Sequence, residues 1–245
     1  MTPRQLAALG RAEFRKFANA RVARQQRAYF KKWEQVRFYG LSTPELTGIA
    51  RKLHNLIRKE WTYFDAVEFC EQLMPDRYSE SKHLALMMLA RYRRRFESTL
   101  LAHAKRWLNG NLCDNWAITD HLASRIVSSL IDRFDSLAPT VESWCRSRNL
   151  WVRRTSAVAF VYFARRGRHL DRAYRITAAL EPDPHDLIQK ACGWLLRECG
   201  KTDAKRLEGY LFRRGPRIAR TTLRYAVEKF PLAERHRILA ATRCC

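Results

Sequence analysis

The chain has 245 residues, of which 47 are lysine or arginine and 24 are aspartate or glutamate, so its formal net charge at pH 7 is +23. Only 9 glycines and 8 prolines are present, which argues against an all-β protein because tight turns consume both. The sequence contains no run of apolar residues long enough to span a membrane, and its 11% of aromatic residues argue against disorder.

Helical periodicity runs along nearly the whole chain. Ser42 or Thr43 is the expected cap of the third helix, with Pro44 in its first turn. Short connections make consecutive helices antiparallel neighbours. In chain order, helices are predicted over residues 3–18, 20–38, 44–60, 62–73, 79–92, 96–108, 115–134, 139–147, 150–166, 169–180, 185–199, 203–213, 216–229 and 231–242.

Three of these segments look like copies of one another. Around Lys82, Arg154 and Lys190, a basic residue is followed by small and apolar residues, and the three are separated by 72 and 36 residues. A period near 36 is typical of stacked helix pairs, in which the second helix of each pair lines the concave face. We therefore predict an all-α protein, an α-solenoid of antiparallel helix pairs with a basic concave groove, forming a single domain over residues 1–245.

The basic residues are spread along the chain and do not form a tail. Arginine, which makes up 36 of the 47, binds phosphate oxygens through a planar fork. A folded basic surface of this kind favours a nucleic-acid backbone as partner, whereas no strongly amphipathic basic helix indicates a membrane surface. The residues expected to contact the backbone are Lys82, Arg148, Arg153, Arg154, Lys190 and Arg197.

The cysteines indicate no chemistry. There are 7, an odd number, with no CxxC pair and no spacing typical of zinc ligands. We therefore expect buried, reduced thiols, a cytoplasmic location, and neither metal nor cofactor.

The segment 115–122 opens a long predicted helix and carries the first candidates for catalysis. Trp116 and Asp120 are four residues apart, so both project from one face of that helix. Asp120 stands in an otherwise apolar pattern, where an unpaired carboxylate is costly. If the helices stack as a solenoid, Trp116, Asp120, Arg154 and Trp194 can meet in one concave cleft.

With these segments the chain resembles the DNA alkylation repair glycosylases of the AlkD type, which are built from HEAT-like helical repeats. The resemblance covers essentially the whole chain. The matching motifs, in the family's order, are Tyr39-Gly40-Leu41-Ser42-Thr43-Pro44-Glu45, Trp116-xxx-Asp120, Trp151-xx-Arg154-Thr155 and Lys190-Ala191-x-Gly193-Trp194-x-Leu196-Arg197-Glu198. The family often has a second carboxylate directly after the first tryptophan, where this chain has Ala117. Tyr29 and Phe30 are the nearest candidates for the family's early tyrosine.

The resemblance implies a glycosylase that removes cationic N3- or N7-alkylated purines from duplex DNA in base excision repair. No lysine is placed by these motifs to form a Schiff base, so we expect a monofunctional enzyme without strand-cleaving lyase activity. The resemblance assigns Trp116, Asp120, Arg154 and Trp194 to the catalytic cleft. Asp120 would stabilise the oxocarbenium-like sugar, the tryptophans would face the cation, and Arg154 would bind the lesion-strand phosphate and keep Asp120 ionised. The resemblance also implies attack from the backbone side, with tolerance of bulky adducts.

Two other functions fit the same predicted fold. One is a non-catalytic HEAT-like protein that binds structured DNA such as junctions, and the retained Trp/Asp/Arg set counts against it. The other is a HEAT-like protein scaffold, which the net charge of +23 disfavours. We expect a monomer whose partner is double-stranded DNA containing alkylated bases.

Overall fold

The computed structural model describes residues 1–242, and in this range the regular structure is helical. A single isolated bridge, between Arg37 and Tyr78, is the one β-type pairing found there. The predicted all-α fold class is therefore confirmed. The chain divides into two compact units, Met1–Leu130 and the part from Ile131 onward. The single domain expected over residues 1–245 stays a prediction.

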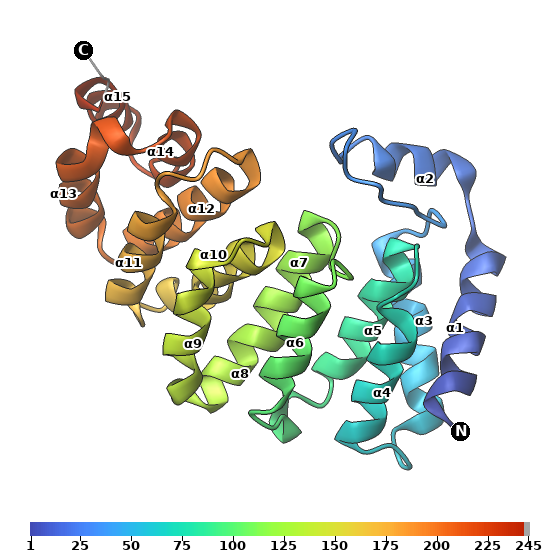
Figure 1. Cartoon of the computed structure of the whole chain (residues 1–245). Coiled ribbons are helices and arrows are strands. Elements are labelled where there is room, and N and C mark those ends of the chain that lie inside the picture. Colours follow the sequence, from blue (N-terminus) through green and yellow to red (C-terminus); the bar gives the residue numbers. More distant parts are fainter. Residues whose placement is uncertain (243–245) are drawn as a thin grey trace. The chain divides into compact units, whose positions relative to one another are not determined.

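Unit 1 is built from packed helix pairs. Helix α4 packs on α1 and α5, while α3, α5 and α7 lie side by side in that order (Figure 1). A π-helical turn, Ala123–Val127, follows α7. The helices that begin in this unit are α1 (Pro3–Phe17), α2 (Ala20–Arg27), α3 (Thr43–Ile57), α4 (Tyr63–Leu73), α5 (Ser79–Ala90), α6 (Leu100–Asn109), α7 (Trp116–Leu122) and α8 (Ser128–Arg133).

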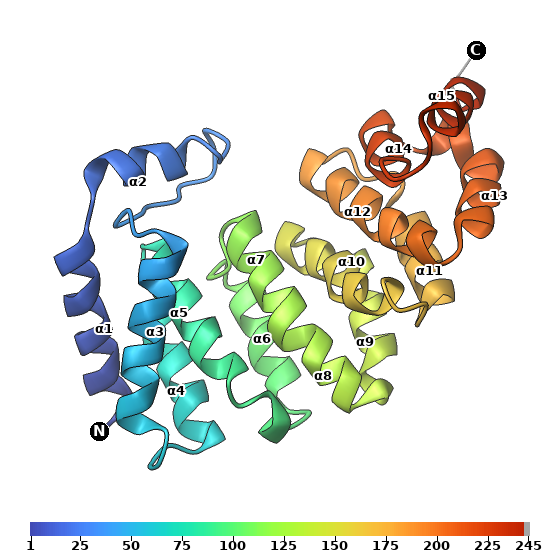
Figure 2. The ribbon, with the colours of Figure 1, turned by 180° about the vertical axis from the view of Figure 1, so that it is seen from behind.

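Unit 2 repeats this arrangement. Helices α10, α12 and α14 form one row, α11 packs on α10 and α12, and α13 packs on α12 and α15 (Figure 2). Both units thus follow the helix-pair pattern of an α-solenoid. The helices are α9 (Ala138–Ser143), α10 (Leu150–Ala164), α11 (Leu170–Leu180), α12 (Asp186–Thr202), α13 (Ala204–Arg214), α14 (Arg220–Ala226) and α15 (Leu232–Ala241).

The helix predicted over residues 20–38 is wrong beyond Arg27, where α2 ends. The Arg27 guanidinium donates hydrogen bonds to the carbonyl oxygens of residues 30–32 at 3.0 to 3.3 Å, which holds the chain in a turn. Within that turn the Glu34 carboxylate accepts the backbone N–H of Lys31 at 2.9 Å. These side-chain contacts replace the helical hydrogen bonds that apolar periodicity alone predicted.

The segment between α2 and α3 explains why the motif beginning Tyr39-Gly40-Leu41 contains a glycine. Gly40 has a φ of +91°, which side chains rarely tolerate. Its N–H and that of Leu41 are donated to the buried Glu80 carboxylate at 2.9 and 3.3 Å. The next residue, Ser42, begins α3 with a reciprocal capping box to Glu45. This part of the motif therefore serves folding.

Ion pairs connect successive helix pairs along the chain. Their partners are 29 to 36 residues apart, about one repeat. Examples are Lys82–Asp114, Arg153–Asp183, Arg165–Glu198, Arg168–Asp132, Arg197–Glu228 and Arg214–Glu181. The acidic residues in these pairs hold neighbouring repeats together, so the surplus positive charge lies on other arginines and lysines.

The buried Glu198 gives a prediction for pH. Burial raises the pKa of this carboxyl, but hydrogen bonds from Lys201 and Arg165 outweigh burial and bring the pKa below its usual value of 4.5. A carboxyl with a lowered folded-state pKa contributes stability above pH 4.5 that is lost as pH falls through the folded-state value.

We therefore expect Glu198→Gln to lower the free energy of unfolding at pH 7 by about 1–3 kcal/mol. Between about pH 5 and pH 3 the variant should lose less further stability than the wild type, because it has no carboxyl to protonate. Urea unfolding across this range measures both effects. Parallel pH profiles for the two proteins would contradict the assignment.

Candidate functional site

The first predicted cluster lies on α7 in unit 1. The side chain of the fully buried Asn115 caps the helix by accepting the backbone N–H of Ile118 at 3.1 Å. Trp116 and Asp120 are both half-buried, whereas Ile118 and Thr119 are fully buried. Trp116 and Asp120 therefore share the face of α7 that is turned away from the core, as their spacing predicted.

The ring of Trp116 is supported by an aromatic residue from the turn after α2. Phe30 stacks on Trp116 with ring centroids 5.2 Å apart and an interplanar angle of 22°, and it also packs against Phe38. The other early candidate, Tyr29, is 81% exposed. Of the two aromatic residues that the sequence left open, Phe30 is the one that contacts Trp116.

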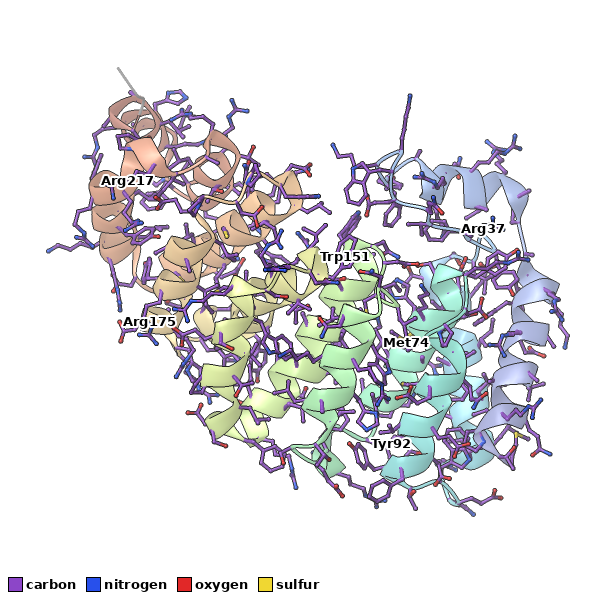
Figure 3. The ribbon with its side chains drawn as sticks, in the orientation of Figure 1. Arg37, Met74, Tyr92, Trp151, Arg175 and Arg217 are labelled. Carbon is purple, nitrogen blue, oxygen red and sulfur yellow. The ribbon has the colours of Figure 1, made fainter. Side chains whose placement is uncertain are left out.

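The second predicted cluster lies in unit 2, on α10 and α12. Arg154 is 5% exposed, and its Nη1 donates a hydrogen bond to the carbonyl oxygen of Leu187 in the first turn of α12. Trp151, labelled in Figure 3, is buried one turn earlier on α10. Trp194 is half-buried on α12, and its indole Nε1 is buried without a hydrogen-bond partner among residues 1–242.

Gly193 precedes Trp194 for a packing reason. A Cβ at this position would lie 2.4 Å from the Cβ of Tyr225 and 2.8 Å from the carbonyl oxygen of Thr222, both on α14. Glycine therefore allows the close approach of α12 and α14 and fixes the part of α12 that carries Trp194.

Most of the predicted backbone-binding residues already have protein partners. Lys82 is only 4% exposed and forms an ion pair with Asp114 at 2.6 Å. In Arg153, Nε contacts Asp183 at 2.7 Å while Nη1 donates to two carbonyl oxygens at 2.8 and 2.9 Å. Both side chains hold the fold together in this structure.

Of the three residues not yet described, Lys190 and Arg148 are more accessible, whereas Arg197 is 19% exposed, much like Arg153. Lys190 contacts Asp186 at 3.3 Å and is about one-third exposed, whereas Arg197 is tied to Glu228. Arg148 is exposed. The role of all six residues in DNA binding stays a prediction, and Arg148 has the most open position for it.

The structure thus brings Phe30, Trp116 and Asp120 together in unit 1 and joins Arg154 to α12 in unit 2. The single cleft predicted for Trp116, Asp120, Arg154 and Trp194 stays a prediction. Residues 1–242 contain no group of three or more His, Cys, Asp or Glu side chains that could hold a metal ion. No helix in this range is long and apolar enough to cross a membrane.

One polar contact was missed by the sequence reasoning. His83 on α5 and His121 on α7 lie with their Nδ1 atoms 2.9 Å apart. They are 38 residues apart, close to the repeat length of 36, and each directly follows a residue singled out above, Lys82 or Asp120. Their spacing, which is close to the repeat length, was the one signal in the sequence that could have predicted this contact.

Comparisons with known proteins agree with the motifs. A family model described as DNA alkylation repair enzyme matches residues 10–230. The fold is similar to that of a predicted DNA alkylation repair enzyme from Enterococcus faecalis, with a TM-score of 0.75 and 18% identity over 87% of this chain and 97% of that one. No curated protein sequence matches the chain. Since the family model spans most of its length, the chain belongs to the family of DNA alkylation repair enzymes.

Proposed function

We propose that the chain is a monofunctional DNA glycosylase that hydrolyses the N-glycosidic bond of cationic N3- or N7-alkylated purines in duplex DNA and leaves an abasic site. The observation that supports this most directly is the arrangement on α7. Asp120 lies one turn from Trp116, whose ring is stacked by Phe30, on the half-buried face of the helix. Membership in a DNA alkylation repair family supplies the substrate class.

These residue types suit the reaction. Alkylation at N3 or N7 puts a positive charge on the purine, which makes the base a good leaving group. As the bond from C1′ to the base nitrogen breaks, the electron pair leaves with the base and the sugar gains oxocarbenium character. The Asp120 carboxylate stabilises that charge and holds or deprotonates the water that attacks C1′. The indole face of Trp116 attracts the same cation.

In unit 2, Arg154 and Trp194 take their proposed roles from the family's motif positions. The bond to the Leu187 carbonyl oxygen orients the Arg154 guanidinium, which we assign to the phosphate of the lesion strand. Trp194 offers a second aromatic face to the cationic sugar or base.

Base release from duplex DNA carrying N7-methylguanine, under single-turnover conditions, tests the proposal. We expect release of the free base and a strand that breaks only after alkaline treatment, because a monofunctional glycosylase leaves the backbone intact. Duplex binding without release, for both a small and a bulky adduct, would instead favour the non-catalytic DNA binder. Neither binding nor release would favour the scaffold.

Replacing Arg154 by lysine is expected to weaken both duplex binding and base release, each by about tenfold. Lysine keeps the positive charge but lacks the planar fork that contacts a carbonyl and a phosphate together. Duplex affinity and the single-turnover rate measure the two effects, and thermal unfolding shows whether the variant is folded. A folded variant with wild-type affinity and rate would remove Arg154 from the site.

A further inference from the structure

Unit 1 contains a surface cavity of about 460 Å³ on the row formed by α3, α5 and α7. Its wall includes residues from all three helices and from the two turns that follow α5 and α7. The polar side chains in the wall are threonines from the first two turns of α3, arginines from the turns, and one histidine each from α5 and α7. The threonines and arginines are Thr43, Thr47, Arg91, Arg93 and Arg125.

The charge of this wall is entirely positive. Arg91 directly follows α5, Arg93 lies in the next 3-10 turn, and Arg125 lies in the π-helical turn after α7. All three are exposed, and none of their side chains is bonded to a carboxylate within residues 1–242. Tyr92, labelled in Figure 3, separates Arg91 from Arg93 and is itself buried, 9% exposed.

Acidic groups do not neutralise the cavity. The wall contains no carboxylate. Glu45, the acid in the first turn of α3, is bonded to the hydroxyl and backbone N–H of Ser42 at 2.8 and 2.7 Å. By contrast, partly buried arginines elsewhere, such as Arg153 and Arg214, contact aspartate or glutamate. Three guanidinium groups without a carboxylate partner therefore surround one cavity, and their combined positive charge attracts an anion from outside the chain.

The histidines in the wall supply hydrogen bonds without adding charge. Burial lowers the pKa of His83 to about 4, and burial together with His83 and Arg125 lowers that of His121 to about 3, so both rings are neutral at pH 7. In a neutral pair bonded through Nδ1, one ring donates its Nδ1–H and the other accepts it. The accepting ring then carries its own proton on Nε2, which leaves the pair one further N–H donor.

We propose that this cavity is a phosphate subsite that takes a backbone phosphodiester of the bound DNA, with Arg91, Arg93 and Arg125 as its cationic ligands and the Thr43 and Thr47 hydroxyls as further donors. The inference rests on the proposed function, because it places part of the same duplex on unit 1. A phosphodiester presents two non-bridging oxygens that share one negative charge, which is the geometry that guanidinium forks match. Free inorganic phosphate has the same chemistry, so the test separates the two sources.

The first arm of the test measures binding of undamaged duplex DNA across a range of salt concentrations. We expect Arg93→Gln and Arg125→Gln each to weaken binding about tenfold at low salt and to reduce the slope of log affinity against log salt by about one, since each removes a phosphate contact. Arg94→Gln is the matched control, because Arg94 is an exposed neighbour in the same turn and does not line the cavity. Its expected loss is about twofold or less. Equal losses in all three variants would overturn the proposal.

The second arm follows the imidazole NMR signals of His83 and His121 during titration with inorganic phosphate, against sodium chloride of equal ionic strength. We expect saturable shifts in the wild type that are lost in Arg125→Gln. Saturable shifts combined with a duplex affinity that does not depend on Arg93 and Arg125 would mean that the cavity takes free phosphate, and the DNA assignment would be wrong. No saturable shift and no dependence of duplex affinity would rule out the subsite altogether.

These outcomes are distinct from failure of the proposed function. Binding of undamaged duplex requires no base release, so a chain that binds DNA through the cavity but releases no base would keep the subsite and lose the glycosylase. If the chain releases base, but Arg93→Gln and Arg125→Gln bind duplex DNA with the same salt dependence as the wild type, the glycosylase is kept and the subsite is lost.

Discussion

Asp120→Asn is expected to reduce the single-turnover rate of N7-methylguanine release by about 10²–10³-fold, because asparagine keeps the size of the side chain but removes the negative charge that stabilises the oxocarbenium-like sugar. Affinity for undamaged duplex should be unchanged or improved, since the variant removes a carboxylate that repels the DNA backbone. Rate and affinity are measured on the same preparation.

The two measurements together separate a catalytic role from a structural one. Asp120 lies on a half-buried face of α7, so a loss of folding would lower affinity and rate together. A drop in rate with intact affinity and an unchanged melting temperature places the chemistry at the carboxylate. If Asp120→Asn releases base at the wild-type rate, Asp120 is not catalytic, whether or not the other three residues have their proposed roles.

Gly40→Ala is expected to be the most destabilising single change in the segment between α2 and α3. The added Cβ would lie 2.1 Å from the carbonyl oxygen of Asn19 and 2.7 Å from the backbone nitrogen of Ala23, and the φ of +91° disfavours any side chain. Strain of this kind and the backbone shift that relieves it cost about 3 kcal/mol together. The midpoint of thermal unfolding should fall by roughly 6–12 °C.

Gly48 provides the matched control. It lies in α3 and is exposed, and a Cβ there would meet no atom within 4 Å. Gly48→Ala should therefore stabilise the protein by about 0.5–1 kcal/mol, because alanine is the better helix former. The same substitution then has opposite signs at two positions. A small loss of stability in Gly40→Ala would contradict this prediction and show that the backbone of the turn before α3 can shift at little cost.

The small number of carboxylates explains two features of the arginine-rich surface, the ion pairs between repeats and the basic residues that have no acidic partner. Each buried or half-buried carboxylate in the ion pairs between repeats stabilises one or more cations, and Glu198 contacts three of them, Arg165, Arg197 and Lys201. With 24 acidic residues against 47 basic ones, many cations are left without such a partner. The three arginines of the unit 1 cavity are among these cations without a carboxylate partner. The polyanion that membership in the family indicates is DNA.

Local sequence determined most of the helices. Apolar periodicity and capping residues placed α3 and α12 within a few residues of their observed bounds, because a helix buries one stripe of side chains whatever its neighbours are. Spacing also placed Trp116 and Asp120 on one face of α7, since residues four apart in a helix project together. The family resemblance rested on such local motifs and was confirmed by the match over residues 10–230.

Only the tertiary structure decided the contacts between segments distant in sequence. The stacking of Phe30 on Trp116 and the pairing of His83 with His121 depend on side chains from segments far apart in the sequence. The end of α2 at Arg27 is a local effect that apolar periodicity does not report, because it depends on hydrogen bonds from the Arg27 guanidinium to the carbonyl oxygens of residues 30–32. The burial of Lys82 was likewise decided by the tertiary structure, which places its ammonium against Asp114, and its DNA contact stays a prediction. A charge in a sequence does not show whether it faces solvent or a partner, because burial is set by the packing of neighbouring repeats.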